Sequence, residues 1–221
     1  MIVLHNVLPH LFGSLALIYD SSVLFREDEI RRIWARFHSL NPIDAKSARP
    51  KLPVTTVLAM PELANNPFKY RIIRYFSKSA KQMEFLIPPH VPSNQNDIPA
   101  QYYTSVIQRP EMLQRMYFEF DDFINMFSVF SSRAMLDTKS AAAFGIYDFT
   151  EDRAIDVVDI QCVIMTALGS SFSAQDTLHI ARDIMQVADS DGNRQLDVLE
   201  FARILKRIPE FMANFQIDFD F

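Results

Sequence analysis

Oxygen-bearing side chains recur at regular intervals in a short acidic segment, residues 189–200. Counted from its first residue, positions 1, 3, 5, 7, 9 and 12 hold Asp189, Asp191, Asn193, Gln195, Asp197 and Glu200. An EF-hand loop takes its ligands from these six positions, with a backbone carbonyl at position 7 and a bidentate Glu at position 12. We therefore predict a site for Ca²⁺ and/or Mg²⁺ here. An acidic, solvated turn between two helices is the alternative.

A second segment with the same spacing, residues 148–159, is a weaker candidate. Its expected ligands are Asp148, Thr150, Asp152, the carbonyl of Ala154, Asp156 and Asp159. Thr150 is a poorer ligand than Asp, and Asp159 is one methylene shorter than Glu, so bidentate coordination is harder. Because Mg²⁺ favours six-coordinate geometry, this loop suits Mg²⁺ better than Ca²⁺. Binding of Ca²⁺, binding of Mg²⁺ or weak mixed binding, and a metal-free structural loop all stay open.

Position 6 of both loops departs from the pattern. The sharp turn there requires a positive φ and favours Gly, whereas this chain has Arg153 and Arg194. Left-handed backbone costs a non-Gly residue roughly 1–2 kcal/mol, which predicts an affinity weakened by about tenfold rather than lost. The apolar residues at position 8, Ile155 and Leu196, are expected to pair in a short ladder between the loops.

Apolar residues at helical spacing flank both loops and recur along most of the chain. We expect helices at 27–40, 55–60, 67–76, 118–130, 137–147, 159–168, 173–188 and 200–208. In the helix at 67–76, the charged residues gather on the side opposite the apolar one; they are Lys69, Arg71 and Arg74. The whole pattern predicts an all-α protein of short helices joined by acidic loops.

Two stretches lack this periodicity. Residues 77–115 contain five prolines, and we interpret them as an exposed insertion, because so long a structureless stretch is uncommon inside a compact domain. Residues 2–19, within the N-terminal segment 1–21, are mostly apolar but are interrupted by Pro9 and Gly13. We interpret them as a packed N-terminal segment rather than a targeting peptide or a membrane span.

The composition narrows the classes of function. Of the 221 residues, 49% are apolar, and the 19 Phe and 10 Met can fill a core or line a groove for a partner helix. A net charge of −5 argues against nucleic-acid binding. The single cysteine, Cys162, leaves no internal disulfide. With four glycines there is no Gly-rich phosphate loop and no nucleophile motif, so we expect no enzyme.

Four blocks of sequence, in the same order, carry a resemblance to a known family. They are MPELANNPFKYRIIRYF at 60–76, FINMFSVF at 123–130, AFGIYDF at 143–149 and PEFMANFQI at 209–217. They resemble the calcium- and integrin-binding protein family, which is related to calcineurin B and the neuronal calcium sensors. The similarity covers roughly residues 22–77 and 117–217. The third loop of that family ends in Asp, as residue 159 does here.

The resemblance implies four EF-hands in two lobes of paired helix–loop–helix units. The first two EF-hands would be degenerate, and only the last two loops would bind Ca²⁺ or Mg²⁺. Residues 1–21 would be a variable N-terminal segment, 22–135 an N-terminal lobe that carries the 77–115 insertion, and 136–208 the C-terminal EF-hand pair. Residues 209–221 would be a tail that occupies or leaves a groove.

Members of that family are cytosolic adaptors that hold amphipathic helices of membrane proteins in a hydrophobic groove. Here the groove residues would be Phe120, Phe123, Phe127, Phe130, Phe144, Ile204 and Leu205. The partner would be an integrin α-subunit tail or, slightly favoured by analogy, a transmembrane channel-like protein in mechanosensory cells, with this chain as auxiliary subunit of the channel.

The same resemblance implies a cytoplasmic protein that is peripheral at the plasma membrane through its partner. Residue 2 is Ile rather than Gly, so we expect no myristoyl anchor. Two alternatives stay open: a regulatory subunit of a phosphatase or kinase, and a metal-independent structural clamp.

Overall fold

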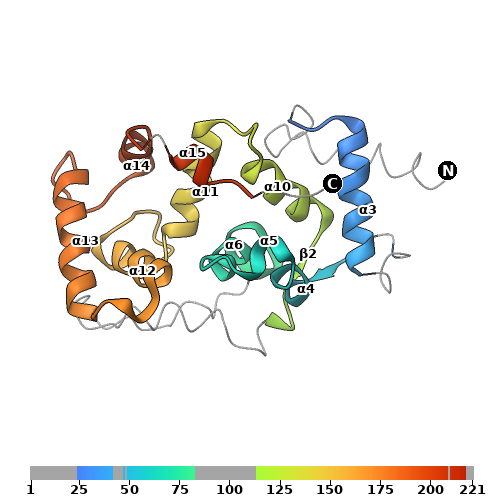
Figure 1. Cartoon of the computed structure of the whole chain (residues 1–221), viewed down its shortest axis with the longest axis horizontal. Coiled ribbons are helices and arrows are strands. Elements are labelled where there is room, and N and C mark those ends of the chain that lie inside the picture. Colours follow the sequence, from blue (N-terminus) through green and yellow to red (C-terminus); the bar gives the residue numbers. More distant parts are fainter. Residues whose placement is uncertain (1–23, 42–46, 48, 83–112, 209, 218–221) are drawn as a thin grey trace.

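The computed structural model describes residues 24–41, 47, 49–82, 113–208 and 210–217, and these are mostly helical. Figure 1 shows an elongated arrangement, with α3 at one end of the long axis and α12 and α13 at the other. The predicted all-α class is confirmed. The predicted N-terminal segment 1–21 lies outside the described residues, as do residues 83–112 of the predicted insertion.

The first half of the described chain consists of short helices and one small strand pair. Its helices are α3 (Glu27–Leu40), α4 (Val54–Leu58), α5 (Pro61–Ala64), α6 (Lys69–Phe76), α7 (Lys78–Lys81) and α10 (Phe120–Phe130). Strand β1 (Leu52–Pro53) runs antiparallel to β2 (Tyr117–Phe118), with Leu52 opposite Phe118. The pair ties the segment before α4 to the segment before α10.

The second half contains the two predicted metal loops. Its elements are α11 (Leu136–Tyr147), α12 (Val157–Leu168), the 3-10 turn η2 (Gly169–Ser171), α13 (Ala174–Ala188), α14 (Val198–Leu205) and α15 (Phe211–Asn214). Gly169 ends α12 with a positive φ of 62°, as a helix-terminating glycine does. Ser173 and Asp176 form a capping box at the start of α13.

Two large buried apolar clusters and a small third one, of Phe149 and Cys162, form the core of the described residues, and α11 contributes to both large clusters. The first cluster is built mainly from α3, α4, α6 and α10, and it includes Ala142 and Ile146. The second surrounds the two loops and α14, and it includes Ala143 and Phe144. Successive residues of α11 therefore face different cores, which makes this helix the shared element between the two halves.

Both edges of the predicted 77–115 insertion belong to the fold. Residues 78–81 form α7, and the Ser79 hydroxyl donates to the Tyr117 carbonyl and accepts from the Tyr117 amide, each at 2.8 Å. Leu113 and Met116 are buried in the first core. The predicted bounds of the insertion, 77 and 115, therefore lie within structured segments. The sequence did not show this, because single serine hydroxyls that bind a distant backbone leave no periodic pattern.

The aromatic stripe of α10 lies in the core rather than on an open surface. Its members Phe120, Phe123, Phe127 and Phe130 are all at most 6% exposed. Of the other predicted groove residues, Phe144 and Leu205 are buried and Ile204 is half-buried. At the end of the stripe, the Phe215 ring lies 5.1 Å from the Phe130 ring, and the Ile217 amide donates to the Phe130 carbonyl at 3.1 Å. The C-terminal segment therefore covers this end of α10.

The tail is also held from α11. The Lys139 ammonium group is buried and donates to the carbonyls of Met212 and Phe215 at 3.2 and 2.8 Å. These are carbonyls at the end of α15, where a positive charge is favourable. None of the helices in the described ranges combines the length and hydrophobicity needed to cross a membrane.

Candidate metal centre

The two predicted loops lie side by side through their position-8 residues. The Ile155 amide donates to the Leu196 carbonyl at 3.0 Å, and the Leu196 amide donates to the Ile155 carbonyl at 2.8 Å. Both side chains are buried in the second core. The predicted ladder between the loops is confirmed.

In the first loop, residues 148–159, three carboxylates converge. Oxygens of Asp148, Asp152 and Asp159 all lie within 4.8 Å of one another. Asp159 is fully buried, and its two oxygens accept from the amides of Thr150 at 2.9 Å and Asp156 at 3.0 Å. Burial raises the pKa of Asp159, and the charges of Asp156 and Asp148 act in the same direction. A divalent cation would neutralise this concentrated negative charge, so the donor set fits Ca²⁺ or Mg²⁺.

In the second loop, residues 189–200, the converging carboxylates are those of Asp189, Asp191 and Glu200, again within 4.8 Å. Asp189 accepts from the Arg194 and Gly192 amides, each at 2.8 Å. Glu200 accepts from the Ser190 hydroxyl at 2.6 Å and from the Ser190 amide at 3.0 Å. These hydrogen bonds hold the pKa values of Asp189 and Glu200 below their usual range. Both carboxylates are therefore ready to bind a cation in their charged form.

The position-9 residues of both loops cap helices instead of joining the clusters. Asp156 accepts from the Val158 amide at 2.7 Å, and Asp197 accepts from the Leu199 amide at 2.8 Å. This is why α12 and α14 each begin two residues earlier than the sequence predicted. The Asp-x-x-Asp and Asp-x-x-Glu spacing is that of a capping box, and it could have located the true starts of both helices from the sequence.

The remaining predicted ligands lie in the turns beside the clusters. The Thr150 hydroxyl is 3.4 Å from oxygens of both Asp148 and Asp159. The Asn193 side-chain amide donates to Asp191 at 3.0 Å. The amides of Ala154 and Gln195 donate to the side chains of Asp152 and Asn193, respectively. Coordination by the carbonyls of Ala154 and Gln195 stays a prediction.

The position-6 arginines adopt the backbone that the sequence predicted for them. The φ angles of Arg153 and Arg194 are 71° and 67°, so both residues are left-handed where Gly is the usual choice. A third residue, Glu151, is also left-handed, with a φ of 59°. Nothing in the spacing of the first loop indicated this.

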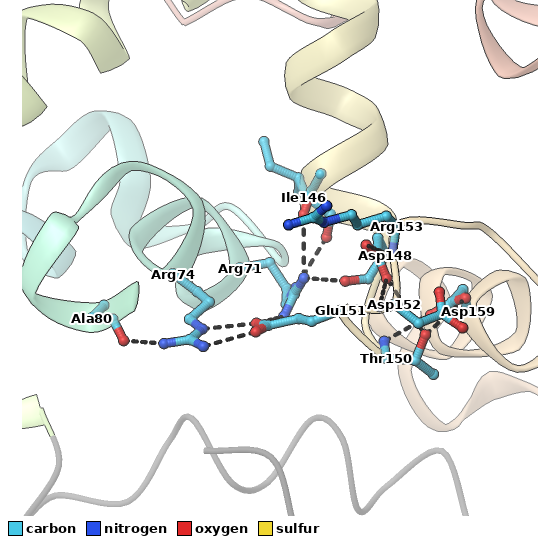
Figure 2. A network of polar contacts seen from close by, with 11 residues as sticks. Arg71, Arg74, Ala80, Ile146, Asp148, Thr150, Glu151, Asp152, Arg153 and Asp159 are labelled. Atoms are coloured by element: carbon cyan, nitrogen blue, oxygen red, sulfur yellow. Dashed lines mark hydrogen bonds and ion pairs between the residues drawn. The ribbon is translucent and has the colours of Figure 1, made fainter. Parts of the chain in front are cut away.

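The first loop is held against α6 by contacts that the sequence did not indicate (Figure 2). Arg71 and Arg74 are buried, at 5% and 6% exposure, although they were expected on the polar side of their helix. Arg74 binds Glu151 through two hydrogen bonds of 2.7 Å, and Arg71 approaches the same carboxylate at 3.2 Å. The spacing of Arg71 and Arg74 places them on one helical face, but no local signal pairs them with a residue so distant in sequence.

The two loops differ in how much of the protein surrounds them. In the first loop, Asp148, Phe149, Ile155 and Asp159 are buried. In the second loop, only Leu196 and Glu200 are buried, and the turn from Ser190 to Gln195 is exposed. Elsewhere in the described residues, no further group of three acidic, histidine or cysteine side chains converges. That the first two EF-hands are degenerate stays a prediction.

Paired helix–loop–helix units, bridged at position 8 and carrying carboxylates at the EF-hand spacing, define an EF-hand protein. Comparison with known proteins is consistent with this class, although no family model matches the chain. Calcium and integrin-binding family member 2 of Drosophila melanogaster is 29% identical over 206 residues, covering 90% of this chain and 91% of the relative.

Two human proteins of the same family name are similar to this chain over the same share of its length. Members 2 and 3 of the calcium and integrin-binding family from Homo sapiens are each 26% identical over 204 residues, covering 90% of this chain and 91% of each relative. The resemblance to the calcium- and integrin-binding family is therefore confirmed over about nine-tenths of the chain.

Proposed function

We propose that this protein is a calcium-binding adaptor whose two loops bind Ca²⁺ or Mg²⁺. The bound ions stabilise the second half of the molecule, from α11 to α15, in which both loops lie. The observation that carries the proposal is the pair of carboxylate clusters, each with three oxygens within 4.8 Å. Hard oxygen donors of this kind suit both ions. The names of the relatives, which are called calcium and integrin-binding proteins, support calcium as the ion and adaptor as the role.

Calorimetric titration with Ca²⁺ and with Mg²⁺ tests the metal sites. The unaltered chain is expected to bind two ions, and Glu200→Gln or Asp148→Asn is expected to abolish or strongly weaken one of them. Asp137→Asn is a matched control, because Asp137 is an exposed carboxylate outside both loops. Titrations without heat, together with an unchanged melting temperature in EDTA, would refute metal binding.

We also propose that the partner is an amphipathic helix of a membrane protein, either an integrin α tail or a transmembrane channel-like protein. The protein would then be cytoplasmic and peripheral at the plasma membrane. The covering of Phe130 by Phe215 and Ile217 supports a site for an apolar helix at the end of α10. A partner helix that reaches Phe130 must first replace this part of the tail. Integrin as a partner class rests on the names of the relatives.

Fluorescence polarisation with labelled peptides tests the partner. One peptide is an integrin α tail, and the other is an amphipathic segment of a transmembrane channel-like protein. Phe215→Ala weakens the packing of the tail and is expected to tighten binding severalfold, and Lys139→Met acts in the same direction. Lys206→Met, at an exposed lysine, is the control. If neither peptide binds any of these proteins, the partner proposal fails.

A second candidate is a largely metal-independent structural clamp. It is favoured by the contacts of Arg71 and Arg74, which hold the first loop through protein groups alone. Peptide binding and a melting temperature that do not change in EDTA would select this candidate over the adaptor that depends on metal.

A further inference from the structure

Glu151 occupies position 4 of the first loop, which supplies no ligand in an EF-hand. Its side chain points away from Asp152 and Asp159 and towards α6 (Figure 2). There, both of its oxygens accept from Arg74 at 2.7 Å, and one of them accepts from Arg71 at 3.2 Å. Burial opposes ionisation of Glu151, but the hydrogen bonds and charges of the two arginines outweigh it and lower its pKa. Glu151 is thus a charged, oriented anchor and not a spare ligand.

Arg71 holds the residue at which the loop begins. Its guanidinium donates to the Ile146 carbonyl at 3.0 Å, to the Gly145 carbonyl at 3.2 Å and to the Asp148 carbonyl. These are carbonyls at the end of α11, which lack partners within the helix, and a positive charge is favourable there. Asp148 supplies the first predicted ligand. Arg71 therefore fixes the position and direction of the chain as it enters the metal site.

The same contacts reach beyond the loop into the first half of the molecule. Arg74 also donates to the Ala80 carbonyl at the end of α7. Ser79 of α7 is in turn bonded to Tyr117 of β2. These hydrogen bonds, together with the backbone of α7 between Ser79 and Ala80, link the first loop to α6, α7 and β2. Figure 2 shows its central part, from Ala80 through the two arginines to the carboxylate cluster.

Within the described part of the chain, the second loop has no counterpart to this anchor. Its position 4 is Gly192, which has no side chain and near which an added Cβ would meet no atom within 4 Å. The backbone is left-handed at both position-4 residues, but only Glu151 carries a side chain, and it lies directly between Thr150 and Asp152, two predicted ligands. A shift of Glu151 away from the arginines would move both neighbours. The anchor therefore belongs specifically to the first loop.

We propose that Arg71, Arg74 and Glu151, the Glu151 clamp, position the first loop for its cation, so that cation binding there and docking of α6 strengthen each other. This proposal rests on the proposed metal binding. A loop already held in shape loses less conformational freedom when it binds an ion. Because thermodynamic coupling is reciprocal, an ion that binds better to the clamped loop must also stabilise the clamp by the same factor.

The test uses the full chain with Glu200→Gln, so that calorimetry follows the first loop alone. Adding Glu151→Gln removes the charge of the anchor and keeps its shape. We expect the affinity of the first loop for Mg²⁺ or Ca²⁺ to fall about fivefold to fiftyfold, within the usual range of coupling. Hydrogen exchange gives a second measurement: the cation is expected to slow amide exchange in α6 of the parent but not of the Glu151→Gln protein.

Two further variants guard against a trivial result. Arg74→Lys keeps the positive charge and loses the two-bond fork, so it is expected to fold and to lose about twofold to fivefold in affinity. Glu62→Gln disrupts the partly buried pair of Glu62 with Arg36, away from both loops, and is expected to leave the affinity of the first loop unchanged.

The outcomes separate the two proposals. If the parent binds the cation and Glu151→Gln binds it equally well with unchanged exchange in α6, the clamp is a structural bridge only, and this inference is overturned while the metal site stands. If the parent binds no cation at the first loop, the proposed metal function fails at that loop and the inference fails with it.

Discussion

The two proposed metal loops, residues 148–159 and 189–200, share their ligand spacing and differ in what holds them. The first loop is enclosed: Asp148 and Asp159 are buried, and Glu151 is bound by two arginines of α6. In the second loop, Leu196 and Glu200 are buried, Asp189 is half-buried and the other residues are exposed. Ligand spacing therefore indicates where a cation is expected to bind, whereas the surrounding side chains would decide how much of the loop the cation still has to order.

The largest difference between the loops is expected in the unfolding free energy lost when an arginine is removed: Arg71 of α6, which contacts the first loop, or Arg194 of the second loop. Arg71→Ala removes a buried guanidinium that serves three carbonyls and the carboxylate of Glu151. Leaving such groups buried and unpaired typically costs about 3–5 kcal/mol of unfolding free energy. Urea unfolding at neutral pH measures this loss.

Arg194→Ala in the second loop is the matched control, because the Arg194 side chain is exposed. It is expected to change the unfolding free energy by no more than about 0.5 kcal/mol. A loss for Arg71→Ala as small as that of Arg194→Ala would show that α6 does not hold the first loop.

Chelation is expected to affect the two loops unequally. At a free cation concentration of 100 times Kd, each bound ion contributes about 2.7 kcal/mol to stability, and EDTA removes it. The Arg153 amide donates to Asp148 at 3.0 Å and the Arg194 amide donates to Asp189 at 2.8 Å, so the two amides report on equivalent positions. In EDTA, exchange of the Arg194 amide is expected to accelerate at least about tenfold more than that of the Arg153 amide. Equal acceleration would remove the distinction between an enclosed and an exposed loop.

Close packing of α6 on α11 gives a smaller effect. A Cβ added to Gly145 would lie 2.3 Å from Cε2 of Tyr75, so Gly145→Ala is expected to cost about 1–3 kcal/mol through overpacking. Combining it with Tyr75→Leu is expected to recover part of that loss, which thermal unfolding would detect. Gly192→Ala meets open space in the second loop, and its cost is limited to the backbone, with its φ of 78°. Full tolerance of Gly145→Ala would contradict the close contact.

The sequence was sufficient for those features that depend on local order along the chain. Ligand spacing located both carboxylate clusters, and the position-8 residues predicted the Ile155–Leu196 bridge. The left-handed backbone of Arg153 and Arg194 followed from the turn that the loop requires. Each of these inferences uses residues within a single motif or between two copies of it.

The features that the sequence did not indicate are contacts between residues that lie far apart along the chain. Arg71 and Arg74 have the composition of a solvated helix face, and only the packing of α6 on α11 brings them to Glu151. The contact of Phe215 with Phe130 is of the same kind: the family resemblance implied a tail that can occupy a groove, but the spacing of residues did not pair these two rings. A charged or aromatic residue has the same local pattern whether it meets solvent, a distant partner or the tail of its own chain.

The smallest predicted effect is the change in cation affinity when the left-handed arginine at position 6 of each loop is replaced by Gly. We expect the exposed second loop to leave the left-handed conformation at Arg194 when no ion is bound, so that the ion has to restore it. Arg194→Gly removes roughly 1–2 kcal/mol of that cost and adds about 0.5–1 kcal/mol for ordering Gly. The result is an affinity about threefold tighter.

In the clamped first loop, the conformation at Arg153 is already imposed by folding, so Arg153→Gly is expected to leave the affinity unchanged. Calorimetry on both variants decides the point, and an equal gain in both loops would mean that the Glu151 clamp does not shape the first loop before its cation binds.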